Sequence, residues 1–323
     1  MKKWMWVVIA AVAVLLAAGI AIWFFTDWTV TVGICYRYAD SDSNREYRDQ
    51  LEKSLQDMGY EVVAVDCDND QSKQLQQLRQ LKEKTAQVLI VEPAMSAASE
   101  ELLAALEDLA LPAVLVGEIP EETPEQPGIV CVGTDSAVPG ILHAQTLLEL
   151  SDQGDLNGDG AVSCMILTGP EDSLESVNYY QCCLKALKLG PLGTDLLCTV
   201  SSDGTREGAH QRTAAELRTY GMDIEVILCA NDTLALGAAD AIREGGWKPG
   251  QDIYLFGVGG TAEAVKATEE GTLTCTVLEL PGQRVQTVAQ TVRAMLEETP
   301  VENCYILECV AVTAKNAAEY LPK

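Results

Sequence analysis

The sequence predicts an α/β fold of two doubly wound parallel-sheet lobes, preceded by one transmembrane helix. Three features of the chain lead to this prediction. Short segments rich in Val, Ile and Leu alternate with amphipathic stretches, as in parallel sheets covered by helices on both faces. The alternation restarts near the middle of the chain, and the first 28 residues contain a long uncharged apolar run.

The first half of the body contains five predicted strands and three predicted helices. The apolar strand segments are 30–36, 61–66, 87–92, 113–116 and 130–133. The amphipathic helix segments are 46–58, 72–84 and 98–109. The segment 118–128 is rich in Pro and Glu, which indicates a surface loop rather than a linker between independent domains.

The second half repeats the same order of elements. Predicted strands cover 162–167, 196–200, 226–229, 253–258 and 273–278, and predicted helices cover 138–150, 174–187 and 234–244. Two similar α/β lobes follow from this repetition.

The N-terminus predicts where the protein resides. Lys2 and Lys3 precede an uncharged apolar run from Trp4 to Phe25, whose helix would be roughly 33 Å long, enough to cross a bilayer. A cleavable signal peptide is the alternative, but it has a shorter apolar core and a small-residue cleavage site. We therefore expect residues 1–28 to form an uncleaved, single-pass anchor in the cell membrane. The lysines before the span orient the body outside the cytoplasm.

Composition excludes some partners. The formal net charge is −26, which disfavours binding to nucleic acid and to anionic membrane surfaces. The eleven cysteines are odd in number and have no regular spacing. Seven of them lie in Val/Ile/Leu-rich runs, where small buried hydrophobes are expected: Cys35, Cys67, Cys131, Cys164, Cys198, Cys229 and Cys275.

Residues 155–163 form the most chemically specific segment of the chain. Asp155, Asn157 and Asp159 carry side-chain oxygens at alternate positions before Gly160, as in a calcium-binding loop. The carbonyl of Ala161 and the hydroxyl of Ser163 would extend the ligand set. Position twelve of the loop is Ile166 in an apolar run, so the segment is not an EF-hand. The alternative is a metal-free Asx/Gly surface turn.

The body resembles type I periplasmic binding proteins and, within them, is similar to the glucose/galactose-binding receptors of ABC importers. The resemblance extends over nearly all of residues 30–312. It rests on VGICYRY (32–38), DNDQSK (68–73), VGTDS (132–136), IEVILCAND (224–232), FGV (256–258) and GTLTCTV (271–277).

The resemblance implies a clamshell in which two lobes close about a hinge on a ligand. The first lobe is then expected to contain residues 29–134 and 280–306, and the second 135–279 and 307–323. In the receptor branch a distant Glu completes the calcium shell, and it corresponds here to Glu225. Calcium is thus the expected cofactor, with Glu225 as its sixth ligand.

The resemblance also implies ligand-binding residues, only some of which match the sugar receptors. Asp40 and Asn231 fall on positions that hydrogen-bond the sugar. Other family positions carry different residue types, and aromatic rings for stacking on a sugar are missing. Asp42 and Gly204 stand where the family has the two stacking aromatic residues. Glu92 stands where the family has an Asn, and Gly259 where it has an Asp. The family's cluster of His, Asp and Arg corresponds here to Ser173, Glu175 and Tyr179.

The departures leave two interpretations open. The protein binds a ligand other than the family's sugars, or it has lost the ability to bind a ligand. Carboxylates facing the cleft would favour a cationic or heavily hydroxylated ligand. The predicted function is a membrane-tethered receptor that delivers a small polar, saccharide-like ligand to an ABC permease. The alternative is a sensor or partner-binding module that contacts a membrane sensor protein. Enzymatic activity is not expected, because His143 and His210 lie in no nucleophile motif.

Overall fold

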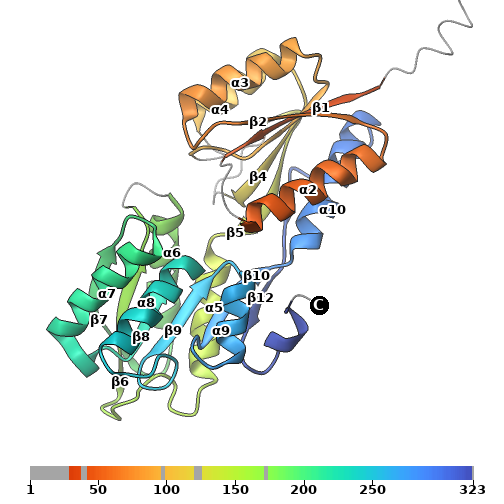
Figure 1. The fold of residues 1–323 in the computed structure, drawn as a ribbon. Helices are drawn as coiled ribbons and strands as arrows, with labels where there is room; N and C mark the ends of the chain where they lie inside the picture. Colours follow the sequence, from red (N-terminus) through yellow and green to blue (C-terminus); the bar gives the residue numbers. More distant parts are fainter. Residues whose placement is uncertain (1–28, 38–41, 96–98, 120–125, 171–173, 322–323) are drawn as a thin grey trace, which may run out of the picture.

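The computed structural model describes residues 29–37, 42–95, 99–119, 126–170 and 174–321, which form two α/β lobes (Figure 1). Each lobe contains one six-stranded sheet with helices on both faces. Two doubly wound parallel-sheet lobes, as the alternation of strands and helices predicts, are therefore confirmed.

The first sheet is parallel throughout and has the order β11-β5-β4-β3-β1-β2. Its strands are β1 (Thr31–Tyr36), β2 (Glu61–Asp66), β3 (Val88–Val91), β4 (Ala113–Ile119), β5 (Ile129–Asp135) and β11 (Cys304–Ile306). Its helices are α2 (Asp42–Asp57), α3 (Gln71–Glu83), α4 (Glu100–Leu109) and α10 (Pro281–Leu296).

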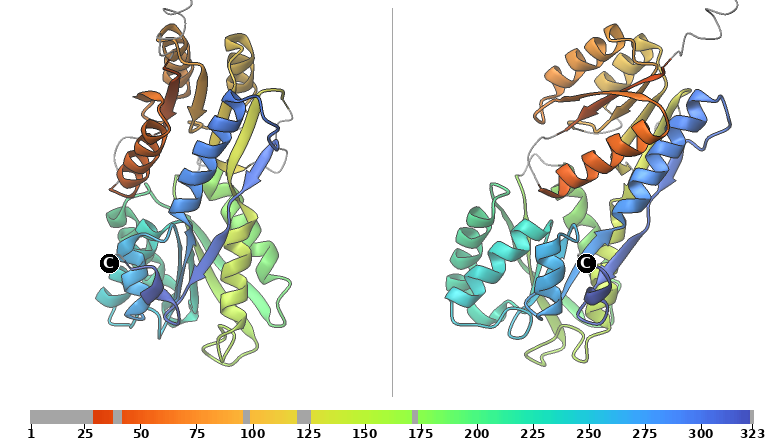
Figure 2. Two further views of the ribbon diagram at one scale, coloured as in Figure 1. Left: turned by 90° about the vertical axis from the view of Figure 1, so that its right-hand side faces the viewer. Right: turned by 45° about the vertical axis from the view of Figure 1, so that its right-hand side comes forward.

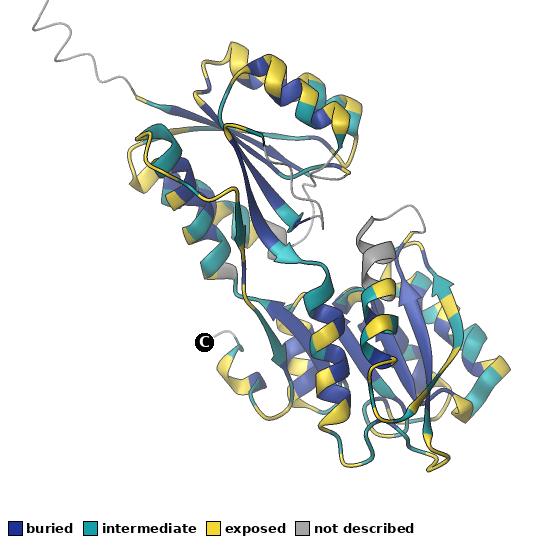
Figure 3. Cartoon of the chain, turned by 180° about the vertical axis from the view of Figure 1, so that it is seen from behind, coloured by how far each residue is buried: buried dark blue, intermediate teal, exposed yellow. Residues whose placement is uncertain are grey.

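Two cores pack on opposite faces of this sheet, because successive side chains of a strand point to opposite sides. In β3, Leu89 and Val91 join the core beneath α3 and α4. Val88 and Ile90 join the core beneath α2 and α10. Figure 3 shows the buried strands enclosed by helices whose outer faces are exposed.

The second sheet has the order β12-β10-β9-β8-β6-β7 and is parallel except for its edge strand β12. Its strands are β6 (Ala161–Thr168), β7 (Gly193–Ser201), β8 (Val226–Cys229), β9 (Tyr254–Val258), β10 (Cys275–Glu279) and β12 (Cys309–Val312). Its α-helices are α5 (Ala137–Leu148), α6 (Leu174–Leu187), α7 (Arg206–Tyr220), α8 (Asp232–Glu244) and α9 (Ala262–Glu269), and two short 3₁₀ turns occupy Gly221–Asp223 and Ala317–Glu319.

Alternation along the strands again supplies two cores. Ile227 and Cys229 of β8 pack beneath α7, α8 and α9. Val226 and Leu228 pack with residues of α5 and α6. The completely buried Phe256 belongs to this second core and lies against the ring of His143.

The chain crosses between the lobes three times, after β5, after β10 and between β11 and β12. The two views in Figure 2 show α10 and the last strands running along one side of the molecule. Near the first crossing Gly133 pairs with Gly117 of β4. A Cβ atom at Gly133 would lie 1.5 Å from the Gly117 carbonyl oxygen, so only glycine fits there.

The predicted strands and helices correspond to observed ones, with ends that differ by a few residues. The strands predicted at 61–66 and 226–229 have the observed bounds. All eleven cysteines are free thiols. Six of the seven expected to be buried are buried, whereas Cys198 on edge strand β7 is only partly covered.

Candidate ligand site between the lobes

The topology turns the carboxyl ends of the two sheets toward each other. Strand β5 leads from its carboxyl end into α5 of the second lobe, and β10 leads from its carboxyl end into α10 of the first. Because the neighbouring strands are parallel, their carboxyl ends lie along the same edge of each sheet. Ligands of open α/β sheets bind outside this edge. The space between the lobes is therefore the candidate site.

Glu92 lies at this edge of the first lobe, directly after the central strand β3. Its backbone is fixed on both sides: its N–H donates to the Cys35 carbonyl at 3.0 Å, and its carbonyl accepts from Gln74 Nε2 at 2.8 Å. The side-chain Oε2 accepts the Arg37 N–H at 3.1 Å. Burial raises the pKa of Glu92, while the Arg37 N–H and nearby guanidinium groups act in the opposite direction.

Two arginines beside Glu92 each have a carboxylate partner. Arg48 of α2 donates to Asp66 Oδ2 at 2.9 Å, and its guanidinium lies 4.1 Å from the centre of the Tyr36 ring. Arg284 of α10 donates from Nε and Nη2 to the two carboxylate oxygens of Glu279. Both cations are therefore held in place by their own ion pairs.

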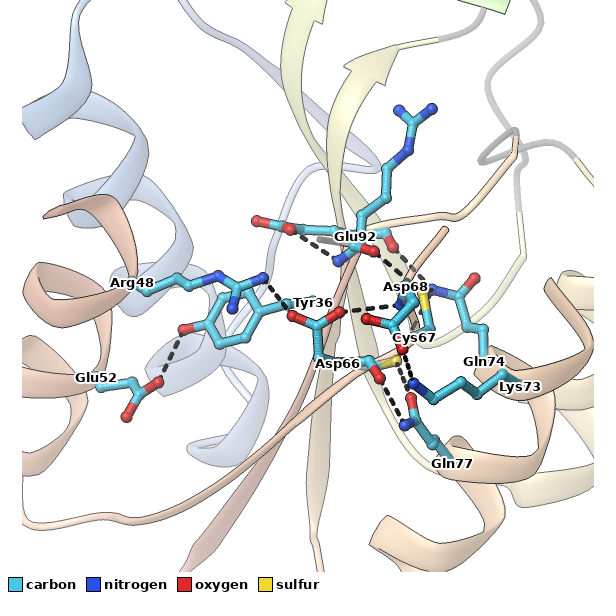
Figure 4. A network of polar contacts seen from close by, with 12 residues as sticks. Tyr36, Arg48, Glu52, Asp66, Cys67, Asp68, Lys73, Gln74, Gln77 and Glu92 are labelled. Carbon is cyan, nitrogen blue, oxygen red and sulfur yellow. Dashed lines mark hydrogen bonds and ion pairs between the residues drawn. The ribbon is translucent and has the colours of Figure 1, made fainter. Parts of the chain in front are cut away.

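Figure 4 shows the polar network in which Glu92 and Arg48 lie. The Tyr36 hydroxyl donates to Glu52 Oε1 at 3.3 Å, and burial raises the pKa of Tyr36. On the other side of Asp66, Gln77 Nε2 donates to the Asp66 carbonyl at 2.7 Å. These bonds connect α2 and α3 to the ends of β1 and β2.

The turn after β2 has an unusual backbone. Asp68 and Asn69 have φ angles of 52° and 57°, a left-handed conformation that costs energy for residues other than glycine. The turn is held by the Asn69 N–H, which donates to the Arg37 carbonyl at 2.8 Å, and by Arg37 Nε, which donates to Asn69 Oδ1 at 2.8 Å. Lys73 forms an ion pair with Asp68. The turn thus supports the segment that follows β1.

In the second lobe Asn231 follows β8 at the edge facing the first lobe. Its Oδ1 accepts the Leu234 N–H at 3.0 Å, so Asn231 is the N-cap of α8. The adjacent Asp232 is buried and accepts from the Thr276 hydroxyl at 2.6 Å and the Thr261 N–H at 2.7 Å. Asp232 therefore joins α8 to β10 and to the start of α9.

The other predicted ligand residues are not placed in detail. Asp40 lies outside the described residues. Asp42 is the first residue of α2, and Glu175 and Tyr179 lie in α6, without described side chains. Gly204 and Gly259, at two of the departures from the sugar-receptor pattern, have φ angles of 85° and 133° that glycine adopts without strain.

Sequence reasoning missed four residues of this region: Tyr47, Thr134, Glu279 and Arg284. Tyr47 packs partly against the core beneath α2 and α10. Thr134 at the first crossing donates its hydroxyl to Glu279 at the second. The available signal was the position of Glu279, immediately after the predicted strand 273–278, where polar residues of parallel sheets face a ligand.

The segment predicted to bind calcium forms a turn closed by its own side chains. Asp155 Oδ1 accepts the N–H groups of Gly158 and Asp159 at 2.7 and 3.1 Å, and its Oδ2 accepts that of Gly160 at 2.9 Å. Asn157 Oδ1 accepts the Asp159 N–H at 2.8 Å. Asp159 Oδ1 accepts the Ala161 N–H at 3.0 Å.

Glu225, distant in sequence, meets this turn. It is 1% exposed and its Oε1 and Oε2 accept the N–H groups of Asn157 and Ser163 at 2.9 and 2.8 Å. The donor set of carboxylates and an amide has the chemistry that a hard cation prefers. In the described ranges, however, no three His, Cys, Asp or Glu side chains are grouped so as to hold a metal.

The predicted membrane anchor, Trp4 to Phe25, lies outside the described residues. Within the described part of the chain, no helix has both the length and the apolar character needed to span a bilayer.

Comparisons with known proteins agree with the fold. The ribose import binding protein of Salmonella typhimurium is 21% identical over 73% of this chain and 74% of its own length. The D-galactose/methyl-galactoside binding periplasmic protein of Haemophilus influenzae is 26% identical over 84% and 82%. The arabinose-transporter binding protein from Shewanella sp. ANA-3, solved with L-arabinofuranose, has a TM-score of 0.78 at 19% identity, covering 90% of this chain and 94% of that one.

The model of the periplasmic binding protein domain matches residues 32–300, which include almost all of both lobes. The relatives are solute-binding proteins rather than enzymes, in agreement with the prediction that this chain is not an enzyme. The chain therefore belongs to the periplasmic binding protein domain family.

Proposed function

We propose that this protein is an extracytoplasmic solute-binding protein that captures a small polar, saccharide-like ligand for an ABC transporter. The observation that carries the proposal is the opposition of two parallel-sheet edges across three crossings, with Glu92 on one side and Asn231 on the other. A ligand held by both edges would stabilise a closed arrangement of the lobes. The sugars printed in the names of the relatives support a hydroxylated ligand.

Calorimetry on the purified full chain tests the proposal. We expect heat of binding from at least one compound in a panel of pentoses, hexoses, inositols and their amino derivatives, together with a smaller radius of gyration in X-ray scattering. Absence of heat from the whole panel at millimolar concentrations would refute saccharide capture. Binding and closure without transport by a permease would instead favour the alternative, a sensor that contacts a membrane protein.

We further propose that residues 1–28 tether the protein to the membrane with the body outside the cytoplasm. The support is the uncharged run from Trp4 to Phe25 after two lysines. Membrane fractionation of the full chain tests this proposal, with a variant that carries two aspartates within the run as the control. Recovery of the unaltered chain in the soluble fraction would contradict it.

We also propose that calcium binds at the turn of residues 155–163. The support is the contact of Glu225 with that turn, because its carboxylate accepts the N–H groups of Asn157 and Ser163 from within the predicted ligand segment. When bound, calcium would supply a positive charge to a turn that contains the carboxylates of Asp155 and Asp159. Asp155, Asn157, Asp159, Glu225, the Ala161 carbonyl and Ser163 would hold it.

A further inference from the structure

Glu92 forms no ion pair with the described residues of the first-lobe part of the site. Arg48 forms its ion pair with Asp66, and Arg284 forms its ion pair with Glu279. Glu92 forms an ion pair with neither of them within the described residues. Among the described residues, the Glu92 side chain accepts the Arg37 N–H at Oε2. Its other carboxylate oxygen, Oε1, can therefore accept a hydrogen bond from a ligand.

A second polar group lies near Arg284, whose guanidinium carbon is 5.5 Å from the centre of the Tyr47 ring. The Tyr47 hydroxyl is buried and has no hydrogen-bond partner in the described part of the chain. Its pKa is raised by burial, and the charges that act on it are those of Arg284, Glu92 and Glu279. Buried hydroxyl groups are normally hydrogen-bonded, so the Tyr47 hydroxyl retains a hydrogen bond that no described residue uses.

The position of Glu92 favours a ligand held between the lobes. Glu92 follows β3, which lies between β4 and β1 in the middle of the sheet. In Figure 4 Glu92 lies between the Arg48–Tyr36 side of the network and Gln74. The carboxyl ends of these strands face the second lobe, so a solute held between the lobes would lie next to Glu92.

The negative charge of Glu92 favours cationic solutes over neutral and anionic ones. A neutral hydroxyl would give the partly buried carboxylate one hydrogen bond, whereas an ammonium group supplies a positive charge and three N–H donors. Hydrogen bonds between opposite charges are roughly twice as strong as neutral ones. An anionic solute would be repelled.

We propose that the ligand of this protein is a polyhydroxylated molecule with a protonated amine, an amino sugar or an aminocyclitol, whose ammonium group binds Glu92 Oε1. This inference rests on the proposed function and specifies the class of its ligand. Arg284 does not compete for Glu92, because Glu279 occupies its Nε and Nη2.

Calorimetry with matched pairs tests the inference at a pH where the amines are protonated. The pairs are D-glucosamine with D-glucose, D-galactosamine with D-galactose, and an amino-inositol with myo-inositol. We expect the amine of at least one pair to bind about tenfold or more tightly than its neutral partner. Acetylation of the amine, as in N-acetyl-D-glucosamine, should remove the advantage.

The outcomes separate this inference from the function on which it rests. Neutral compounds that bind as tightly as the amines would overturn the inference and leave solute capture intact. No binding by either member of any pair would overturn both. Binding of an amine with an advantage that survives in Glu92→Gln would also overturn the assignment to Glu92.

Three variants locate the ammonium. Glu92→Gln keeps the shape and an acceptor for the Arg37 N–H, and should reduce the preference for amines by about tenfold while neutral binding persists. Glu52→Gln is the matched control, because Glu52 accepts from Tyr36 and should leave the preference unchanged. Tyr47→Phe removes a hydroxyl without a described partner, so it should fold normally, and several-fold weaker amine binding in this variant would place the ammonium next to Tyr47 as well.

Discussion

The Thr134 hydroxyl donates to Glu279 Oε2 and so joins two of the three segments that connect the lobes. Glu279 is held at the same time by Arg284 of α10. Cys309, which begins β12 after the third connection, is hydrogen-bonded to Thr134. Burial raises the pKa of the Cys309 thiol, and this hydrogen bond acts against the rise. Thr134 is therefore the polar centre of the hinge.

Thr134→Val should destabilise the protein by roughly 1–2 kcal/mol, because it removes a hydrogen bond to a charged group and keeps the side-chain shape. Urea denaturation measures the change. Thr219→Val is the control, since the Thr219 hydroxyl donates to the Ala215 carbonyl one turn earlier in α7, at an exposed position. Equal effects in the two variants would contradict a special role of Thr134.

Asn231 allows a capping role and a ligand-binding role to be separated. Asn231→Ala should lose about 1 kcal/mol of stability because the Leu234 N–H loses its acceptor. Asn231→Ser keeps an N-cap oxygen but has no amide N–H₂ to offer a solute. We expect Asn231→Ser to melt near the unaltered protein and to bind solute more weakly in calorimetry. Unchanged binding in this variant would limit Asn231 to the cap.

The close approach at Gly133 should make this position intolerant of any side chain. Gly133→Ala would place Cβ 1.5 Å from the Gly117 carbonyl oxygen, so β4 and β5 would have to separate. We expect a loss of several kcal/mol or failure to fold, measured by circular dichroism and thermal melting. Gly282→Ala is the matched control, because a Cβ there meets no heavy atom within 4 Å. Normal melting of Gly133→Ala would show that the sheet can rearrange.

Most strands could be predicted from the sequence because a strand that is buried on both faces is a run of apolar residues. The segment Val226–Cys229 is apolar throughout, since both of its faces pack against helices. Helix α7 was not predicted because its buried side is a narrow stripe of Ala209, Thr213 and Leu217 in a polar segment. Strand β11 is three residues long, too short for a periodic signal.

The site was less predictable because its contacts join distant segments. Asn231 and Glu92 were named from their resemblance to family positions, and both lie at the expected sheet edges. Glu279 and Arg284 are partners through the geometry of the hinge, and neither forms a local motif. The unpaired hydroxyl of Tyr47 is a property of packing, which no single segment encodes.

Glu225 and the turn of residues 155–163 provide a test of the calcium proposal. Glu225→Ala should cost roughly 1–3 kcal/mol, because the buried Ser163 N–H and the partly buried Asn157 N–H lose their acceptors. Added calcium should raise the melting temperature of the unaltered protein in a concentration-dependent manner. Glu225→Gln should weaken this response more than Ser163→Ala, because it removes a charge. A melting temperature that is the same in calcium and in chelator would contradict calcium binding.

The burial of Glu92 predicts a pH dependence of stability. A carboxyl whose pKa is raised in the folded state holds its proton longer there than in the unfolded chain, so stability falls as the pH rises from the ordinary value of 4.5 through the raised one. Arg37 after β1, Arg48 of α2 and Arg284 of α10 oppose this effect without cancelling it. Glu92→Gln cannot ionise, so it should melt at a higher temperature than the unaltered protein at neutral pH. Thermal melts from pH 4 to pH 8 should show the difference shrinking as the pH falls toward 4. A Glu92→Gln variant that is less stable at neutral pH would show that the three arginines outweigh burial, and the carboxylate would then need no cation from a ligand.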